Sequence, residues 1–134
     1  MNPFTIVNPP VLGPPRGFSH GLLAAAGTRL LFVAGQTAAD ADGRIADTRF
    51  VPQFEAALTR VLTVVATAGG RPEHVGRMTI YVTDLDAYLD GRPALGEAWR
   101  RLMGNHYPTM ALVEVKRLVD AAATVEIEAT AVIP

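Results

Sequence analysis

The chain contains no cysteine, which excludes disulfide bonds, thiolate metal sites and a cysteine nucleophile together. It also has little charge, because charged residues make up only 19% of the chain, against roughly a quarter in ordinary soluble domains. The formal net charge is −1, so the surface has no basic excess, and we expect neither a nucleic-acid partner nor a membrane partner. No apolar run approaches the ~20 residues that span a bilayer, and the first residues resemble no signal peptide. These absences favour a cytoplasmic protein.

Apolar residues, by contrast, are plentiful and make up 49% of the 134 residues. A chain of this length is typical of a single domain and can bury a core without disulfides or a structural metal. We therefore expect one domain over residues 1–134. A small domain has a large surface for its volume, so the shortage of charge suggests that another chain covers part of this surface.

Hydrophobic periodicity and turn residues predict an α+β chain of eight elements. Apolar residues at three- and four-residue steps predict two helices, over residues 51–68 and 93–103. Alternating or short apolar runs predict six strands, at residues 4–7, 22–26, 30–34, 75–83, 110–115 and 124–132. The order is β-β-β-α-β-α-β-β, and the turn Gly27-Thr28-Arg29 favours a hairpin between the second and third strands.

The second and third predicted strands are apolar at consecutive positions, as in Leu22–Ala26 and Leu30–Val33. Strands that are buried on both faces lose the alternation of apolar and polar residues. Two helices can cover only one face of so wide a sheet, so something else must cover the other face. A second copy of the chain is the expected cover, and loops of the same chain are the alternative.

The three histidines indicate no metal site, because no two of them have the spacing of a zinc-binding pair on a helix. His74 and His106 flank predicted elements, where we expect capping or surface roles. His20 closes the loop Gly17–Gly21, whose glycines would let the backbone approach a ligand. Judged by spacing alone, His20 belongs to a turn that positions the next strand.

Two further groups are candidates for substrate contacts. Gly35 ends an apolar strand and can leave backbone groups open to a ligand, while Gln36 can donate and accept hydrogen bonds. Glu126 and Glu128 alternate with apolar residues, so both carboxylates point to one face of a strand, about 6.6 Å apart. A carboxylate on an apolar strand needs a partner or water, which a substrate cleft and a solvent-facing edge would both supply. No phosphate-binding loop and no serine-hydrolase elbow is present.

Several motifs, in order along the chain, resemble one protein family. The run Tyr107–Val115, followed by Val125–Val132, resembles the C-terminal signature of the RidA family, also called YjgF/YER/UK-type or L-PSP proteins. Gly17–Gly21 resembles the family's Gly-Pro-Tyr-Ser-Gln-Gly loop. Phe32–Gln36 resembles its Ser-Gly-Gln strand end, and Val82–Leu85 resembles its Val-x-Asp-Leu. The match covers nearly the whole chain, which is therefore identified as a member of this family.

The resemblance implies a chorismate-mutase-like α+β fold, with a mixed sheet, two helices on one face, and a homotrimer that has clefts between neighbouring subunits. It also implies an activity, since characterised members hydrolyse reactive enamines and imines to ketones and ammonia. In those proteins an arginine in the penultimate strand binds the substrate carboxylate. A glutamate in the last strand and nearby backbone groups position the attacking water.

The chain departs from the family pattern at three positions. Met110 stands where the carboxylate-binding arginine belongs, and methionine can neither hydrogen-bond nor charge-pair a carboxylate. Phe18 replaces the loop tyrosine and lacks its hydroxyl group, and His20 replaces the loop glutamine. We expect a less anionic substrate, unless another arginine such as Arg16 or Arg117 supplies the missing charge.

The matching residues indicate how such an enzyme would work. Glu126 matches the family glutamate and is expected to orient or deprotonate water. Gly35 and Gln36 also match and are expected to contact the substrate. The other expected substrate contacts are Phe18, His20, Trp99 and Met110. We therefore expect a hydrolase or deaminase of small imines, enamines or related electrophiles, with no metal and no cofactor.

Two other functions remain open. Loss of the arginine is consistent with a non-catalytic ligand sensor or interaction module that uses the same clefts. Some relatives are described as endoribonucleases or translation inhibitors, but the net charge of −1 and the lack of a basic stripe disfavour an RNA substrate here.

Overall fold

A computed structural model describes residues 2–134 of the chain. The strands and helices in this part are β1 Phe4–Val7, η1 Pro10–Leu12, β2 Gly21–Ala24, β3 Arg29–Gln36, α1 Phe50–Thr67, η2 Pro72–His74, β4 Val75–Val82, α2 Leu85–Asp90, α3 Arg92–Met103, β5 Thr109–Glu114 and β6 Val125–Ile133. The short helix α2 is an addition to the predicted order. It begins after Asp84, whose side chain accepts a hydrogen bond from the backbone N–H of Ala87.

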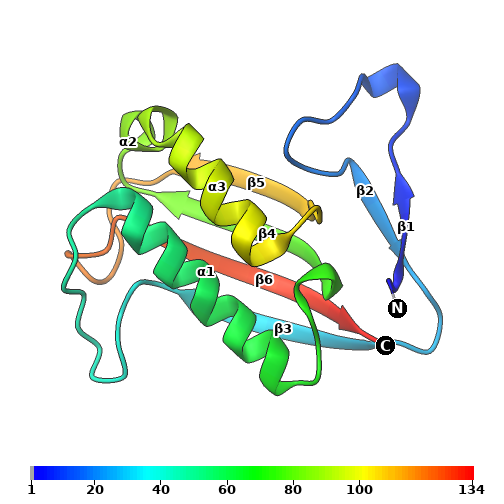
Figure 1. Ribbon diagram of the computed structural model, residues 1–134, viewed down its shortest axis with the longest axis horizontal. Coiled ribbons are helices and arrows are strands. Elements are labelled where there is room, and N and C mark those ends of the chain that lie inside the picture. The colour runs from blue at the N-terminus through cyan, green and yellow to red at the C-terminus, as the bar shows by residue number, and fades with distance from the viewer. Residues whose placement is uncertain (1) are drawn as a thin grey trace.

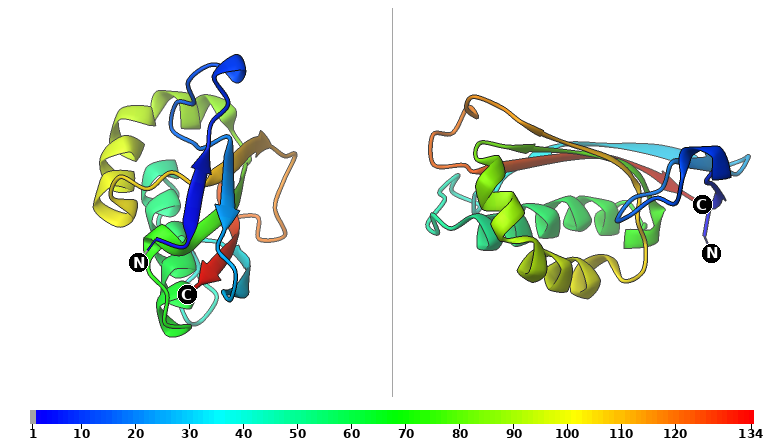
Figure 2. Two further views of the ribbon diagram at one scale, coloured as in Figure 1. Left: turned by 90° about the vertical axis from the view of Figure 1, so that its right-hand side faces the viewer. Right: turned by 90° about the horizontal axis from the view of Figure 1, so that it is seen from above.

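The main sheet has four strands in the order β3-β6-β4-β5. β6 is antiparallel to both β3 and β4, whereas β4 and β5 are parallel, so the sheet is mixed as expected. Helices α1 and α3 lie across one face of this sheet (Figure 1 and Figure 2). The predicted α+β class with two helices on one face is therefore confirmed. No helix within residues 2–134 is long and apolar enough to cross a membrane.

The hydrophobic core lies between this sheet and the two helices. The apolar stripe of α1 is buried there, with Leu58, Val61 and Val65 inaccessible to solvent. It packs on the inward-facing residues of β6, where every second side chain is buried, including Val125 and Ile127. Strand alternation on β6 therefore puts apolar residues against the helices and leaves the residues between them on the opposite face.

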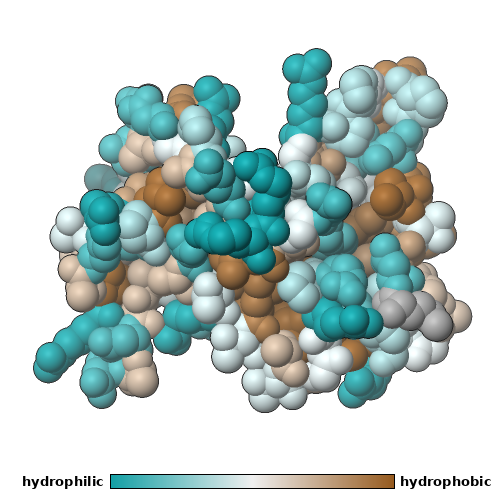
Figure 3. Space-filling view, in the orientation of Figure 1, coloured by the Kyte–Doolittle hydropathy of each residue, from teal (hydrophilic) through white to brown (hydrophobic). Residues whose placement is uncertain are grey.

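The face of the main sheet that is turned away from α1 and α3, called the open face below, carries uncovered apolar side chains. Leu30 is 63% exposed and Phe32 is 76% exposed, and both lie on β3. The alternative that loops of the same chain cover this face is therefore wrong for these two residues. On the helix-covered side, hydrophilic side chains surround hydrophobic patches (Figure 3). The apolar residues of the open face remain available to another chain.

The N-terminal strands pair differently from the prediction. β2 is antiparallel to β1, with Phe4 opposite Ala24 and Val7 opposite Gly21, and it forms no hairpin with β3. The β1–β2 unit stands apart from the main sheet (Figure 1). The predicted hairpin is therefore wrong. The physical reason is that Gly27, with a φ of 78°, turns the chain there but does not decide which strand β2 pairs with.

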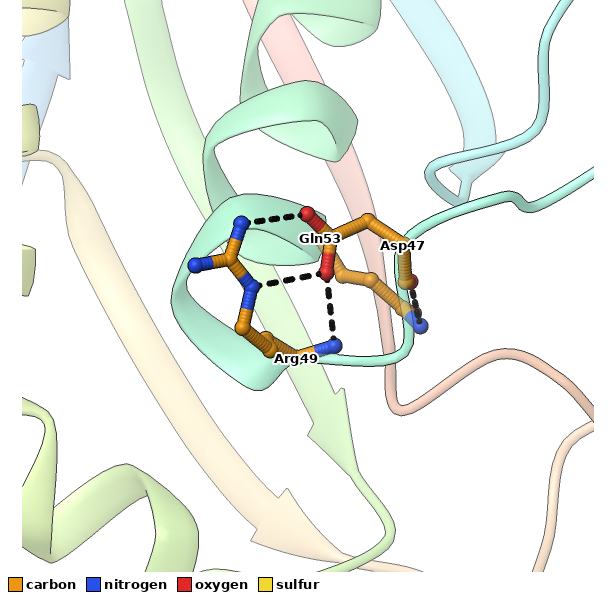
Figure 4. A network of polar contacts seen from close by, with 3 residues as sticks. All are labelled: Asp47, Arg49 and Gln53. Carbon is orange, nitrogen blue, oxygen red and sulfur yellow. Dashed lines mark hydrogen bonds and ion pairs between the residues drawn. The ribbon is translucent and has the colours of Figure 1, made fainter.

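A buried amide ties the start of α1 to two loops. Gln53 is inaccessible to solvent, and its Nε2 donates hydrogen bonds to the carbonyl oxygens of Asp47 and Ala122. Its Oε1 accepts a hydrogen bond from the backbone N–H of Thr124. Beside it, Arg49 pairs with Asp47 and lowers the pKa of that carboxyl group to about 2 (Figure 4). A buried amide without partners would be costly, so this network fixes where α1 begins and how the chain enters β6.

Candidate functional site

A β-bulge near the end of β3 brings Gly35 against Glu126 on the open face. The pairing of β3 with β6 shifts between Val33 and Gln36, so two residues of β3 oppose one residue of β6. A Cβ atom added at Gly35 would lie 2.9 Å from Cδ of Glu126. Any larger residue at this position would force the carboxylate to move, so glycine preserves its observed place.

Glu126 and Glu128 share the open face, as strand alternation predicted, but their surroundings differ. The hydroxyl group of Tyr81 donates a hydrogen bond to Oε1 of Glu128 at 2.9 Å, and this bond raises the pKa of Tyr81. The carboxylate of Glu126 is half-buried and makes no hydrogen bond and no ion pair with any residue from 2 to 134. Both of its oxygens are therefore free to accept hydrogen bonds from water or a substrate.

Gln36 lies on the other side of the bulge. Nε of Arg60, a residue of α1, donates a hydrogen bond to Oε1 of Gln36 at 3.1 Å. Nε2 of Gln36 donates a second one to the carbonyl oxygen of Ala34, also at 3.1 Å. The side chain therefore faces the helix layer and holds the bulge in place. Of the two matching residues at this strand end, the structure places only Gly35 beside Glu126.

A second candidate site is a pocket of about 340 Å³ on the helix-covered side. α3, β5 and the loop before β2 each contribute to its walls. The residues that make it largely apolar and aromatic include Phe18, Phe54, Trp99, Tyr107, Met110 and Leu112. The rings of Trp99 and Tyr107 stack at a centroid distance of 6.1 Å, which gives the pocket one flat wall. The structure thus brings together Phe18, Trp99 and Met110, three of the expected substrate contacts.

His20 does not line this pocket but contacts Phe18, which does. Its Nε2 lies 3.0 Å from the carbonyl oxygen of Gly13, and its ring meets that of Phe18 edge to face at 5.2 Å. The neighbouring Ser19 donates a backbone hydrogen bond to the carbonyl oxygen of Pro108. These contacts hold the loop against the start of β5, so the structure places His20 in the turn that positions Phe18.

Met110 and Glu126 lie on opposite faces of the main sheet. Met110 faces the helices together with Leu112, because β5 runs parallel to β4 with Met110 beside the buried Met78. Glu126 faces the other way, toward solvent. Within one chain the pocket and the carboxylate therefore cannot belong to one site. A site that contains both residues requires a second subunit.

Arg92 was absent from the expected contacts, yet it lines the pocket together with Arg16. The sequence did contain a signal for it. Arg92, Leu95 and Trp99 recur at three- and four-residue steps, so they share one face of α3, and Arg92 is the first residue of that stripe. Amphipathic periodicity therefore places Arg92 on the same face of α3 as the pocket residues Leu95 and Trp99.

The histidines outside the pocket bind backbone groups. Nδ1 of His74 accepts a hydrogen bond from the backbone N–H of Arg71, and Nε2 of His106 lies 2.6 Å from the carbonyl oxygen of Val75. The contact of His74 is the capping type expected for it, whereas His106 binds a backbone group 31 residues earlier in the chain and so connects the segment after α3 to the start of β4. Within the described part of the chain, no three side chains of histidine, aspartate or glutamate come together as a group that could hold a metal ion.

These features define a class of protein: a small α+β chain with a mixed sheet, helices on one face, and candidate site residues on both faces. A family model described as "Endoribonuclease L-PSP" matches residues 12–133. The chain therefore belongs to this family, which is the RidA family of the motifs described above.

Solved structures agree with this assignment. The chain is 29% identical to YyfB from Yersinia pestis, a protein of the conserved Rid family, with 98% of each chain covered and a TM-score of 0.84. It is 28% identical to the YjgF gene product of E. coli, with 93% of this chain and 92% of that chain covered and a TM-score of 0.67. No curated protein matches the chain.

Proposed function

We propose that this protein is a RidA-type hydrolase that converts small reactive imines, enamines or related electrophiles to carbonyl compounds and ammonia. The observation that carries the proposal is the carboxylate of Glu126, which lies against Gly35 and has no hydrogen-bond partner within residues 2–134. A positioned carboxylate with free oxygens is suited to accept a proton from water. The proposed reaction uses no metal and no cofactor, and we place it in the cytoplasm.

In this reaction, water adds to the carbon atom of the protonated C=N bond while Glu126 takes up one proton of the water. The product of the addition is a neutral carbinolamine. Glu126 then returns the proton to the nitrogen atom. The C–N bond breaks as Glu126 accepts the proton of the new hydroxyl group, so that ammonia leaves and a carbonyl group remains. An enamine enters the same route after protonation at carbon converts it to the protonated imine.

We further propose that the protein works as a homotrimer. The exposed Leu30 and Phe32 on the open face favour association, because the removal of apolar surface from water stabilises a complex. In such an assembly, the open faces of the three sheets would face inward and the clefts would lie between neighbouring subunits. Glu126 of one chain and the Trp99–Met110 pocket of the next would then line one cleft.

The test is competition for an imine that forms in the assay. An amino-acid oxidase generates the imine, semicarbazide traps it as a semicarbazone, and a hydrolase lowers the yield of that product. Every imine that this oxidase forms carries a carboxylate, with which Met110 cannot pair. We therefore expect the native protein, but not a heat-denatured sample, to lower the semicarbazone yield only weakly compared with a relative that carries the arginine. An unchanged yield with imines of amino acids that have aliphatic, aromatic and uncharged polar side chains would contradict the hydrolase.

A ligand sensor is the second candidate function. Met110 favours it, because the chain lacks the charge with which relatives hold the substrate carboxylate. A sensor would bind a metabolite in the pocket without turnover. Trp99 is the single tryptophan of the chain and lines the pocket, so its fluorescence reports such binding directly.

A further inference from the structure

The pocket on the helix-covered side has positive charge that nothing in its lining balances. Arg16 and Arg92 both line it, and no aspartate or glutamate does. Arg92 donates Nε–H to the carbonyl oxygen of Leu89 at 3.1 Å, which leaves its two terminal nitrogens without a partner within residues 2–134. In the same part of the chain, the guanidinium group of Arg16 makes no hydrogen bond, and neither arginine forms an ion pair.

The charge and the apolar surface occupy different depths of the pocket. Phe54, Ile80 and Leu95 are buried and form its floor. Arg16 and Arg92 are exposed, so they lie at its mouth. A ligand with a hydrocarbon body and one anionic end would match this gradient. The volume of about 340 Å³ is at the low end for small-molecule sites and suits a skeleton the size of one amino acid.

We propose that Arg16 and Arg92 bind the carboxylate of an apolar monocarboxylic acid, which points its hydrocarbon tail at the floor of the pocket. Guanidinium groups are well suited to this role, because they match the two oxygens of a carboxylate with paired N–H donors. The two arginines would supply, at the mouth of the pocket, the positive charge that is missing because Met110 replaces the family arginine. The ligand class is branched aliphatic or aromatic acids, including their 2-imino and 2-oxo forms. The inference deepens the proposed function and rests on it only where the acid is taken to be a substrate.

The proposal is tested by titrating the native protein with 4-methylpentanoate and with its uncharged amide, at constant ionic strength. Trp99 fluorescence gives both dissociation constants. We expect the acid to bind about five- to fifteenfold more tightly than the amide. This ratio corresponds to a binding free energy between that of a strong exposed ion pair and that of a weak hydrogen bond to a charged group. We choose this range because the arginines are exposed but border an apolar pocket.

Three charge-removing variants locate the effect. Arg16→Gln and Arg92→Gln should each reduce the preference for the acid, and the double variant should bind acid and amide equally. Arg117→Gln is the matched control, because it removes the same charge from an exposed residue that does not line the pocket. Circular dichroism checks that each variant is folded. The proposal is overturned if the native protein binds neither ligand or does not distinguish them, or if Arg117→Gln loses the preference as fully as the pocket variants.

The outcome also separates this inference from the hydrolase proposal. A preference for the acid that depends on Arg16 and Arg92, without imine hydrolysis, would contradict the hydrolase and support the binding site. Equal hydrolysis of neutral and carboxylate-bearing imines would support the hydrolase and contradict the role of the arginines.

Discussion

The open face and the helix-side pocket differ in what each could contribute to the proposed hydrolase. On the open face, Glu126 has free carboxylate oxygens, but the strand surface around it is exposed, as Phe32 shows. The pocket has apolar walls, Trp99 and two arginines, but neither a carboxylate nor a histidine lines it. Hydrolysis needs both a positioned base and an enclosed substrate. In the proposed hydrolase, one subunit would hold each part separately and assembly would unite them.

The largest effect is expected at Glu126. Glu126→Gln keeps the size of the side chain but removes the base, so imine hydrolysis should fall by about 10²–10⁴-fold, the usual contribution of a positioned acid or base. The rate is measured with a substrate that the unchanged protein turns over, after light scattering confirms an intact assembly.

Glu128→Gln is the control for this variant. Glu128 shares the open face but already binds Tyr81, so its loss should have a much smaller effect on the rate. Full activity of Glu126→Gln, or loss of activity in Glu128→Gln, would show that the base has been assigned to the wrong residue.

A second variant tests whether the two regions meet through assembly. Phe32→Glu puts a charge on the most exposed apolar residue of β3, and burial of an unpaired carboxylate at an interface is costly. We expect the mass in dilute solution to drop from that of a trimer to that of a monomer, with loss of hydrolysis. Val119→Glu, in an exposed loop, should leave mass and activity unchanged. A stable, fully active monomer would contradict a shared cleft.

Alanine substitutions of two glycines, Gly35 on the open face and Gly96 in the pocket, distinguish the effect of moving the base from the effect of making the pocket smaller. Gly35→Ala brings a methyl group to 2.9 Å from Cδ of Glu126, and the displaced carboxylate should lower kcat by about ten- to a hundredfold. In Gly96→Ala the new methyl group meets only Arg100, at 3.6 Å, and it narrows the pocket, so KM should rise several-fold with kcat unchanged.

Thermal unfolding complements these kinetics. Alanine in the middle of α3 should raise the free energy of unfolding by about 0.5–1 kcal/mol, because glycine loses more backbone entropy in a helix. If Gly96→Ala lowered kcat while Gly35→Ala raised only KM, the roles of the two regions would be reversed.

The smallest effect concerns Tyr81, whose pKa is raised above 10.0 chiefly by its hydrogen bond to Glu128. A raised pKa means that folding favours the protonated phenol, so this contribution to stability is present below pH 10.0 and is lost as the pH rises through the higher value. In a spectrophotometric titration of the three tyrosines, one should ionise late. Glu128→Gln should return it toward the ordinary range, and an unchanged titration curve would argue against this bond in solution.

Periodicity in the sequence was sufficient for the elements and for the direction of several side chains. The three- and four-residue steps of Leu58, Val61 and Val65 predicted the buried stripe of α1. The alternation around Glu126 and Glu128 predicted that both would leave the core. These features depend on the geometry of a single helix or strand, which repeats every 3.6 or 2 residues whatever the rest of the chain does.

Pairing between distant strands was beyond what periodicity can decide. The turn at Gly27 indicated a hairpin, yet β2 pairs with the earlier strand β1. The family motif led us to expect that Gly35 and Gln36 would both contact the substrate. The bulge after Val33 instead turns the side chain of Gln36 toward the helix layer, away from Glu126. In both cases the sequence indicates a local turn or strand end. Which strand or side chain it then pairs with depends on residues far away in the chain.

The amino-acid sequence by itself determined the family, the α+β class and the residue types available for chemistry. Only the tertiary structure decided that Met110 and Glu126 face opposite sides of the sheet and that Arg92 joins Arg16 at the pocket. The physical reason is strand register. Side chains alternate with a period of two, so a shift of one residue in the pairing of β5 with β4 would move Met110 to the other face, and no local pattern records that choice.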